Sequence, residues 1–227
     1  DPVAGPQDVV VDINAAGVGF VDGLLVQGLY QVKPPLPFVP GNEFAGVISA
    51  VGGDVKNLSV GQRVMGTAAG SYADKLKAPA LLCIPTPADM TDEIAAGFAI
   101  SYATALYAWR DCGKALTGET ALVLGASGGV GQAAIAVGKA MGLRIIGAAA
   151  TEDKRAAAKA AGADETVDYT QPDWRDELKQ LTAKSGLGLV YDPVGGSAAE
   201  AAMRSLSPGG RHLVVGFAAG DIPKVGL

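Results

Sequence analysis

The chain has 227 residues, 49% of them hydrophobic and 18% charged, and its 18 basic against 23 acidic residues give a net charge of −5. This length allows one large or two modest domains with a sizeable core, and an acidic balance without a basic cluster argues against a nucleic-acid partner. No apolar run approaches the length of a membrane span, so no membrane partner is expected. The widely separated Cys83 and Cys112 indicate a reduced, cytoplasmic compartment.

Residues 1–98 are predicted to form a first domain, a small and irregular β-barrel. Strands are expected at 9–13, 45–51, 64–66 and 81–84, because short apolar runs alternate there with turns rich in glycine and proline. Near residue 95 the period changes, and alanines interleaved with bulky apolar residues predict a helix over 93–109. This change of period places the second domain at 99–227.

Strands and helices alternate regularly through the second domain. Strands are expected at 121–125, 144–148, 165–168, 187–191 and 212–216, and helices at 131–141, 152–161, 174–183 and 198–206. Thr151 is expected to cap the second of these helices, while Gly142 and Gly162 end the first and second. Such alternation predicts an α/β fold with a parallel, doubly wound sheet.

A glycine-rich turn joins the first strand and helix of this domain. Residues 124–142 read LGASGGVGQAAIAVGKAMG, and Ala126, Gly128 and Gly131 occupy the three small-residue positions of the dinucleotide fingerprint. Gly128 lets the backbone approach a diphosphate, and Gly131 lets helix and strand pack in contact. With Gly129 and Val130 they are predicted to bind a dinucleotide at the helix N-terminus. A turn without a ligand is the alternative, but the strand–turn–helix order favours nucleotide binding.

Six motifs in this chain match one known family in its own order. They are AAGVGFVD (15–22), PGNEFAGVISAVG (40–52), GASGGVG (125–131), AGADETVDY (161–169), YDPVGG (191–196) and LSPGGRHLVVGF (206–217). On these motifs the chain resembles the medium-chain dehydrogenase/reductase superfamily, in its zinc-free quinone oxidoreductase (zeta-crystallin-like) branch. The resemblance implies a GroES-like β-barrel catalytic domain, a Rossmann domain and a cofactor cleft between them.

The family's subunits extend further at both ends than this chain does. The resemblance therefore implies that a first strand of the catalytic domain and the C-terminal part of the Rossmann domain, with a sixth strand, are missing here. In the family this sixth strand usually pairs subunits, so an intact-length protein is expected to form a homodimer.

The metal-binding positions of zinc-dependent relatives are changed in this chain. Gly19 replaces a cysteine and Asn42 replaces a histidine, while His212, the sole histidine, lies far along the chain. Because zinc needs at least three N, S or carboxylate ligands, we predict no bound metal. Glu43 is then expected to be structural, held by backbone N–H groups or by Arg63. Without a Lewis acid, the favoured acceptors spread their own negative charge, as quinones and conjugated carbonyls do.

The choice of nicotinamide cofactor depends on the end of the second strand of the Rossmann domain. That strand ends in alanines without the acid that NAD sites usually place there, and Glu152 and Asp153 fall instead in the first turn of a helix. By resemblance, Thr151, Lys154 and Tyr169 match positions that bind a 2′-phosphate. A solvated helix lysine is the alternative for Lys154. The pattern predicts NADPH rather than NADH.

Further site residues follow from the resemblance alone. Thr104 should contact the nicotinamide carboxamide, and Val194, Gly216 and Phe217 should line the same cleft, although Phe217 could equally be a core residue. Tyr30, in VQGLYQ, matches a proton-donating tyrosine of enoyl-thioester reductases. Quinone reductases also carry G-L-Y, so Tyr30 as a packing residue remains open.

The sequence thus predicts an NADPH-dependent, zinc-independent oxidoreductase that transfers hydride to quinones or conjugated carbonyls. Two alternatives stay open. One is a 2-enoyl-thioester reductase, which needs an acid such as Tyr30 to protonate carbon, and the other is a non-catalytic NADPH-binding structural protein. Asp22 is interpreted as a structural acid or as a neighbour of the nicotinamide ribose.

Overall fold

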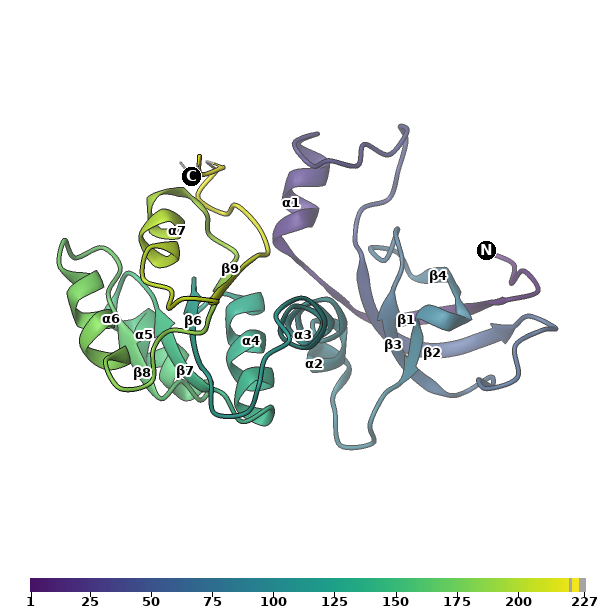
Figure 1. Ribbon diagram of the computed structural model, residues 1–227. Helices are drawn as coiled ribbons and strands as arrows, with labels where there is room; N and C mark the ends of the chain where they lie inside the picture. The colour runs from purple at the N-terminus through teal and green to yellow at the C-terminus, as the bar shows by residue number, and fades with distance from the viewer. Residues whose placement is uncertain (221, 225–227) are drawn as a thin grey trace. The chain divides into compact units, whose positions relative to one another are not determined.

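The computed structural model describes residues 1–220 and 222–224 of the chain. The chain folds as two compact units, Asp1–Ile100 and Ser101–Leu227, each built around a sheet of its own (Figure 1). In the described part of the chain, no helix combines the length and the apolar character needed to cross a membrane.

The first unit contains a five-stranded antiparallel sheet. Its strands, in spatial order, are β4 (Lys75–Pro79), β1 (Asp8–Gly17), β2 (Glu43–Val51), β3 (Arg63–Thr67) and β5 (Cys83–Pro85). The shorter helical elements are α1 (Phe20–Val26), the 3-10 turn η1 (Ala80–Leu82) and α2 (Asp92–Ala96). Alternate residues of the strands, such as Val9 and Val11, point into one buried core with Phe44 and Val64.

Two local predictions for this unit are corrected by the structure. The strand expected over 81–84 begins only at Cys83, because η1 precedes it and Leu81 is 92% exposed. The sequence analysis also missed β4 and α1. In β4 the buried Leu76 and Ala78 alternate with lysines in a very short segment, and α1 buries only Asp22, so neither shows an apolar pattern.

The single helix expected over 93–109 is divided in the structure. Thr91 caps α2 by accepting a hydrogen bond from the backbone N–H of Ile94, and α2 ends at Gly97. After this break α3 (Ala99–Leu106) begins, and it continues into a π-helical turn, η2 (Tyr107–Cys112). Glycine is a poor helix former, which accounts for the interruption.

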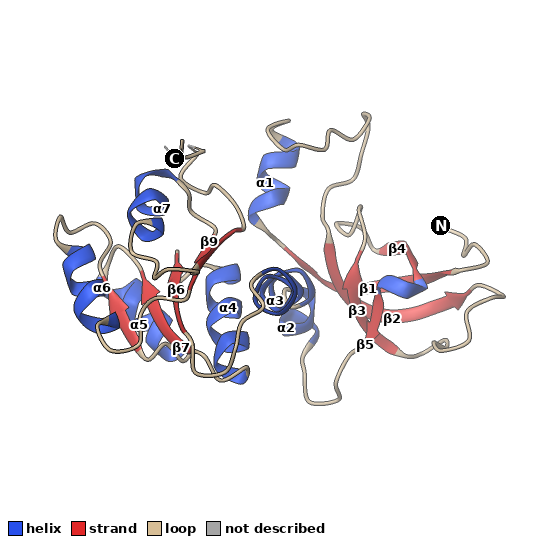
Figure 2. Ribbon diagram, viewed as in Figure 1, coloured by secondary structure: helices blue, strands red, loops and turns tan. Residues whose placement is uncertain are grey.

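The second unit confirms the predicted parallel, doubly wound sheet (Figure 2). Its strands, in spatial order, are β10 (Arg211–Val214), β9 (Leu189–Asp192), β6 (Thr120–Leu124), β7 (Arg144–Ala148) and β8 (Glu165–Val167), all parallel. Its remaining helices are α4 (Gly129–Ala140), α5 (Glu152–Ala160), α6 (Trp174–Thr182) and α7 (Gly196–Met203). Thr151 is the N-cap of α5, and Gly142 and Gly162 follow α4 and α5 with positive φ, as predicted.

Buried side chains cover both faces of this sheet. On one face Trp109 donates from Nε1 to the carbonyl of Ala134 in α4 at 2.9 Å, and its ring lies 5.2 Å from that of Tyr191 in β9. On the other face Trp174 and Leu178 of α6 pack with α7 and the central strands. The chain order reverses between β6 and β9, so a topological switch point lies at their carboxyl ends, where open α/β sheets bind ligands.

Candidate functional site

The turn between β6 and α4 presents backbone donors at the switch point. Gly128 is the N-cap of α4 with extended backbone (φ −75°, ψ 164°), and its carbonyl accepts the N–H of Gln132 at 2.8 Å. The N–H groups of residues 129–131 therefore precede the first intrahelical bond, and Gly128 has no side chain to cap them. Together with the helix dipole they form a site suited to an anion such as a diphosphate.

The two glycines of this turn have different structural roles. A Cβ atom on Gly131 would lie 2.3 Å from the carbonyl oxygen of Gly125 and 3.0 Å from Cα of Ala126, so the close packing predicted for Gly131 is confirmed. A Cβ on Gly128 would meet only the Gly125 oxygen, at 3.4 Å. The fold itself therefore requires glycine at 131, whereas the role of Gly128 in ligand approach stays a prediction.

The turn after β7 carries the predicted phosphate-binding residues of α5. Thr151 Oγ1 accepts the N–H of Lys154 at 3.4 Å, and both side chains are exposed. Strand β7 ends at Ala148, and the buried Ala149 follows it, so the segment that ends this strand carries no carboxylate of its own. The neighbouring Arg155 turns back toward the sheet, where its Nη1 lies 3.3 Å from the carbonyl oxygen of Ala149.

The turn after β8 lies beside the turn after β7, because β7 and β8 pair in parallel up to Ala148 and Val167. Asp168 starts this turn, and its Oδ1 accepts hydrogen bonds from the N–H and Oγ1 of Thr170 at 3.0 and 2.6 Å. These bonds lower the pKa of Asp168. Tyr169 follows Asp168 and is half-buried against the core below α6. The structure thus brings Tyr169 to the turn adjacent to the one that carries Thr151 and Lys154.

Asp192, at the end of β9, holds the turn that follows this strand and contacts β10, and the sequence did not single it out. Its Oδ1 accepts the N–H groups of Val194 and Gly195 at 2.8 and 2.9 Å, and its Oδ2 lies 2.9 Å from Nε2 of His212. Burial raises the pKa of Asp192, but the bonds from His212 and the backbone outweigh it and hold the pKa below its usual value. Asp192 lies two residues before Val194, whose N–H its side chain accepts. This spacing is a turn signal that can be read from a sequence.

Val194, Gly216 and Phe217 lie at the carboxyl ends of β9 and β10. A Cβ on Gly125 would lie 2.9 Å from Cγ2 of Val194, so this side chain packs directly over the fingerprint turn. Backbone bonds from Gly216 N to Asp192 O at 3.2 Å and from Ala219 N to Val194 O at 2.9 Å tie the two segments together. The structure therefore brings Val194 to the β6–α4 turn and Gly216 to the segment that follows β9.

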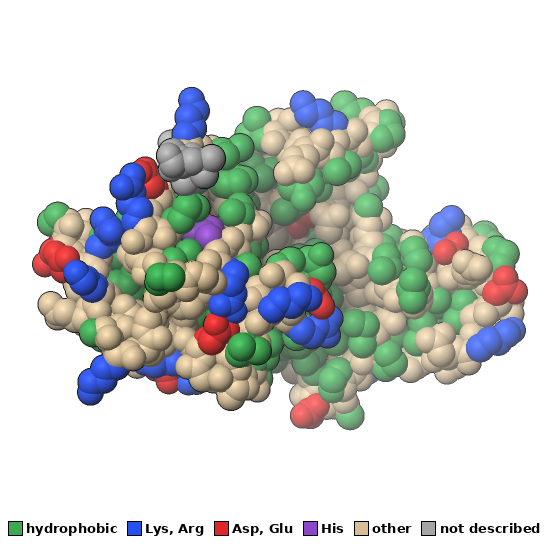
Figure 3. All heavy atoms as spheres, viewed as in Figure 1, with side chains coloured by type: hydrophobic (Ala, Val, Ile, Leu, Met, Phe, Trp, Pro, Cys, Tyr) green, Lys and Arg blue, Asp and Glu red, His purple; other side chains and the backbone are tan. Residues whose placement is uncertain are grey.

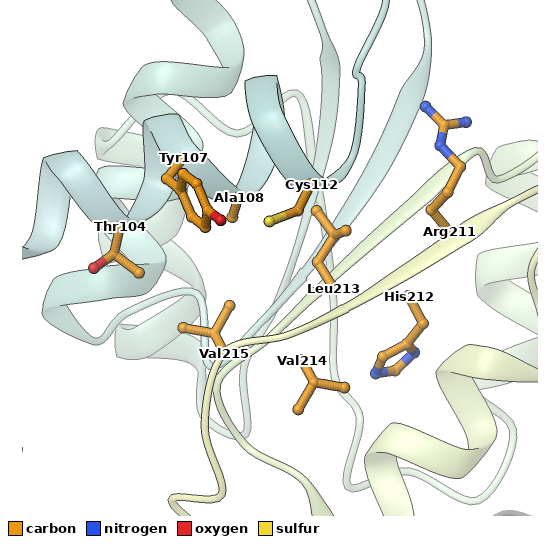
Figure 4. Close-up of a pocket in the computed structure, with 9 residues that line it drawn as sticks. All are labelled: Thr104, Tyr107, Ala108, Cys112, Arg211, His212, Leu213, Val214 and Val215. Atoms are coloured by element: carbon orange, nitrogen blue, oxygen red, sulfur yellow. The ribbon is translucent and has the colours of Figure 1, made fainter.

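Thr104 lines a cavity of about 600 Å³ on the outer side of β10 (Figure 4). The other lining residues are Tyr107, Ala108, Cys112, Arg211, His212, Leu213, Val214 and Val215. Figure 4 shows Thr104 and Val215 at one end of the cavity and Arg211 at the other, so the cavity follows the strand from end to end. Only the end with Thr104 reaches the carboxyl edge of the sheet, and the remainder of the cavity is separate from the predicted nucleotide site.

Tyr30 and Asp22 belong to the first unit. Tyr30 is half-buried in the loop after α1. Asp22 is buried, and its two carboxylate oxygens accept hydrogen bonds from Nδ2 of Asn42 at 2.7 Å and from the N–H of Gly19 at 2.8 Å. Asp22 therefore holds together the two positions at which zinc-dependent relatives were expected to carry metal ligands.

Glu43 is a buried carboxylate with a backbone partner. Its Oε1 accepts the N–H of Ile100 at 2.6 Å, whereas Arg63 pairs with Asp92 at 2.6 Å, so of the two expected partners the backbone is right and Arg63 is wrong. Burial and the nearby charge of Asp22 raise the pKa of Glu43 against the effect of its backbone bonds. Across residues 1–220 and 222–224, no three His, Cys, Asp or Glu side chains gather in a group that could hold a metal.

A five-stranded parallel sheet with a glycine-rich turn at its switch point defines a Rossmann-type dinucleotide-binding unit, here preceded in the chain by an antiparallel unit. Two family models match: alcohol dehydrogenase GroES-like domain over residues 5–142, and zinc-binding dehydrogenase over residues 129–226. The chain therefore belongs to the medium-chain dehydrogenase/reductase superfamily, with the GroES-like and Rossmann folds that the sequence predicted.

Three similar proteins illustrate this membership. The rat quinone oxidoreductase-like protein 2 is 38% identical over 97% of this chain, which spans 64% of that protein's length. The Escherichia coli quinone oxidoreductase, solved in complex with NADPH, is 31% identical with a TM-score of 0.90 and covers 100% of this chain, which spans 70% of it. The CurK enoyl reductase is 26% identical, with a TM-score of 0.86. The match covers 93% of this chain and 66% of the CurK chain.

Proposed function

We propose that the chain binds NADPH and acts as a zinc-independent oxidoreductase that reduces quinones or conjugated carbonyls. The observation that carries the proposal is the open β6–α4 turn, whose three leading N–H groups lie beside the end of β7. That strand ends in alanines without a carboxylate of its own and is followed by the exposed Lys154. The similarity to a quinone oxidoreductase solved with NADPH supports the same cofactor. When bound, the nicotinamide would supply the hydride.

The chain's own residues would hold the cofactor at three places. The N–H groups of residues 129–131, next to Ala126 and Gly128, would bind the diphosphate, because they are the donors that α4 leaves without an intrahelical partner. The side chains of Thr151, Lys154 and Tyr169 would bind the 2′-phosphate. The residues proposed to contact the nicotinamide end and exclude water there are Thr104, Val194, Gly216 and Phe217.

The residue types near Glu43 support an acceptor that needs no metal. Gly19 and Asn42 offer no ligand of the kind zinc prefers, and the Glu43 carboxylate is engaged with the N–H of Ile100. An acceptor that delocalises its own negative charge, as a quinone or an enone does, needs no Lewis acid to stabilise an alkoxide. We infer this acceptor class from the side chains present.

An exposed apolar segment around α1 supports an apolar acceptor. Figure 3 shows hydrophobic side chains on the surface over α1. The exposed members of the segment are Val18, Phe20, Val26, Leu29, Val32, Leu36 and Val39, of which Val18 is 85% and Phe20 65% exposed. A concentration of exposed apolar side chains in one segment is a feature of surfaces that bind apolar ligands.

A 2-enoyl-thioester reductase is the second candidate, favoured by the similarity to an enoyl reductase and by Tyr30. The two activities are separated by following NADPH absorbance with a benzoquinone and with a crotonyl thioester. We expect turnover with the quinone, unchanged in Tyr30→Phe because water can protonate the hydroquinone oxygens. Turnover with the thioester alone, abolished in Tyr30→Phe, would reverse the assignment. NADPH binding without turnover of either acceptor would instead support a non-catalytic binding protein.

The cofactor assignment has its own test in Lys154→Ala. Loss of a charged hydrogen bond of about 1–3 kcal/mol should weaken NADPH binding by about 5- to 150-fold, with NADH binding almost unchanged. Lys159→Ala is the matched control, because Lys159 lies in the last turn of the same helix and pairs there with Glu165. Equal losses for both cofactors in a fluorescence titration would refute the phosphate contact.

The proposal extends to a cytoplasmic homodimer. Strand β10 lies at the edge of the sheet, and an edge strand is able to pair with a further strand. Light scattering on the purified protein should give twice the subunit mass, and a monomer would contradict this part of the proposal.

A further inference from the structure

Arg155 follows Lys154 on α5 but points in another direction. Its side chain is only 24% exposed, and its Nη1 lies 2.8 Å from Oδ2 of Asp168 and 3.3 Å from the carbonyl oxygen of Ala149. It thereby connects the end of β7 with the end of β8. Of the two adjacent cations, Arg155 contacts Asp168 and Ala149, whereas Lys154 is exposed.

Asp168 places a carboxylate in the turn that carries Tyr169. Its Oδ1 is fixed by both the N–H and the hydroxyl of Thr170, and Oδ2 faces Arg155. A carboxylate beside a bound phosphate repels it, unless a cation compensates the charge. The same carboxylate, left uncompensated, is a good acceptor for a neutral ribose hydroxyl.

We propose that Arg155 is a specificity-determining positioning residue, which acts on the cofactor through Asp168 and not by contact with the 2′-phosphate. Its positive charge compensates the negative charge of Asp168, and its contacts connect the turn after β8, which carries Tyr169, with the turn after β7. Both effects keep this edge of the sheet suited to a phosphorylated adenosine. This inference rests on the proposed NADPH site and adds a residue whose loss shifts preference from NADPH toward NADH.

The test is a double-mutant cycle, read as NADPH and NADH dissociation constants by fluorescence titration of the chain. Arg155→Gln should weaken NADPH binding by about tenfold, because the charge of Asp168 is then uncompensated but still partly screened by solvent, and should leave NADH binding unchanged or stronger. Asp168→Asn alone should leave NADPH binding equal or tighter, because it removes a negative charge beside the phosphate while Asn keeps an oxygen for Thr170. Added to Arg155→Gln, Asp168→Asn should restore most of the lost NADPH affinity.

The opposite model makes different predictions in the same cycle. If Arg155 contacted the phosphate directly, the double variant would stay as weak as Arg155→Gln, because removing the Asp168 charge would not restore the lost contact. That result would overturn the inference while leaving the NADPH site intact. Arg155→Lys, which keeps the charge, should retain most of the affinity, and Arg204→Gln, which removes an exposed pair with Glu200, is the matched control. Absence of NADPH binding by the unaltered chain would overturn the proposed function itself, and this inference with it.

Discussion

The carboxylates of the first unit and the backbone donors of the second unit differ in where their hydrogen bonds go. Asp22 accepts from Asn42 and Gly19, and Glu43 accepts from Ile100, so these buried acids are engaged by their own fold. In the second unit the N–H groups of residues 129–131 lie at an open turn. Groups satisfied within the fold contribute to stability, whereas donors at an open turn are available to a ligand. Substitutions in the first unit should therefore change stability, and those at the turn should change cofactor affinity.

Gly131→Ala should be an exception to this comparison. Gly131 belongs to the turn, but its lack of a side chain is needed for packing within the fold. Its new Cβ would lie 2.3 Å from the carbonyl oxygen of Gly125, which is backbone and cannot move cheaply. We expect a loss of about 2–4 kcal/mol in the free energy of unfolding, measured by urea denaturation. Gly53→Ala is the control, since a Cβ there meets nothing within 4 Å. An unchanged urea midpoint for Gly131→Ala would contradict the close packing.

Gly128→Ala, three residues earlier, should do the opposite: it should weaken cofactor binding and leave the stability of the fold almost unchanged. Its φ of −75° suits any residue and its Cβ would meet only one atom, at 3.4 Å, so the unfolding free energy should change by less than about 0.5 kcal/mol. The methyl group would, however, hinder approach of a diphosphate to the N–H groups, at a cost of about 1.5–3 kcal/mol in NADPH binding. Unchanged NADPH affinity in this variant would contradict the proposal that the diphosphate binds at this turn.

The predictability of the molecule follows the same division between local and distant contacts. The alternating strands and helices of the second unit were predictable, β7 to the residue, because each depends on a local apolar period and on caps such as Thr151. The role of Gly131 was predictable because the fingerprint sets its spacing. By contrast, α1 buries only Asp22 and so shows no apolar period.

The partnerships around the site were out of reach of the sequence for a different reason. Arg155 meets Asp168, and Asp192 meets His212, only because parallel strands bring separate turns to one edge of the sheet. The sequence showed Lys154 and Arg155 as equal cations next to each other. Only the contacts of Arg155 with Asp168 and Ala149 separate their roles.

Asp192→Asn would sharpen the comparison, because this buried acid of the second unit is satisfied by its fold as those of the first unit are. Asn lacks the negative charge that strengthens the hydrogen bonds from Val194, Gly195 and His212. We expect a loss of about 1–3 kcal/mol in unfolding free energy at pH 7. The folded-state pKa of Asp192 lies below its unfolded value. Its contribution is therefore present above the unfolded pKa of about 3.9 and is lost as the pH falls through the folded pKa. Urea titrations at pH 7 and pH 3 should show the difference shrinking, and a constant difference would indicate that the charge of Asp192 does not matter.

Glu43→Gln should give the smallest effect and the opposite dependence on pH. Burial raises the folded-state pKa of Glu43, so its carboxylate disfavours the folded state increasingly as the pH rises from the unfolded pKa through the folded pKa. Gln keeps an oxygen for the N–H of Ile100 without that charge. Allowing for solvent screening, we expect the variant to match the unaltered chain at pH 4 and to exceed its unfolding free energy by no more than about 1 kcal/mol at pH 7. A variant that becomes relatively less stable as the pH rises would mean that the bond from Ile100 outweighs the burial of the charge, and Glu43 would then resemble Asp192.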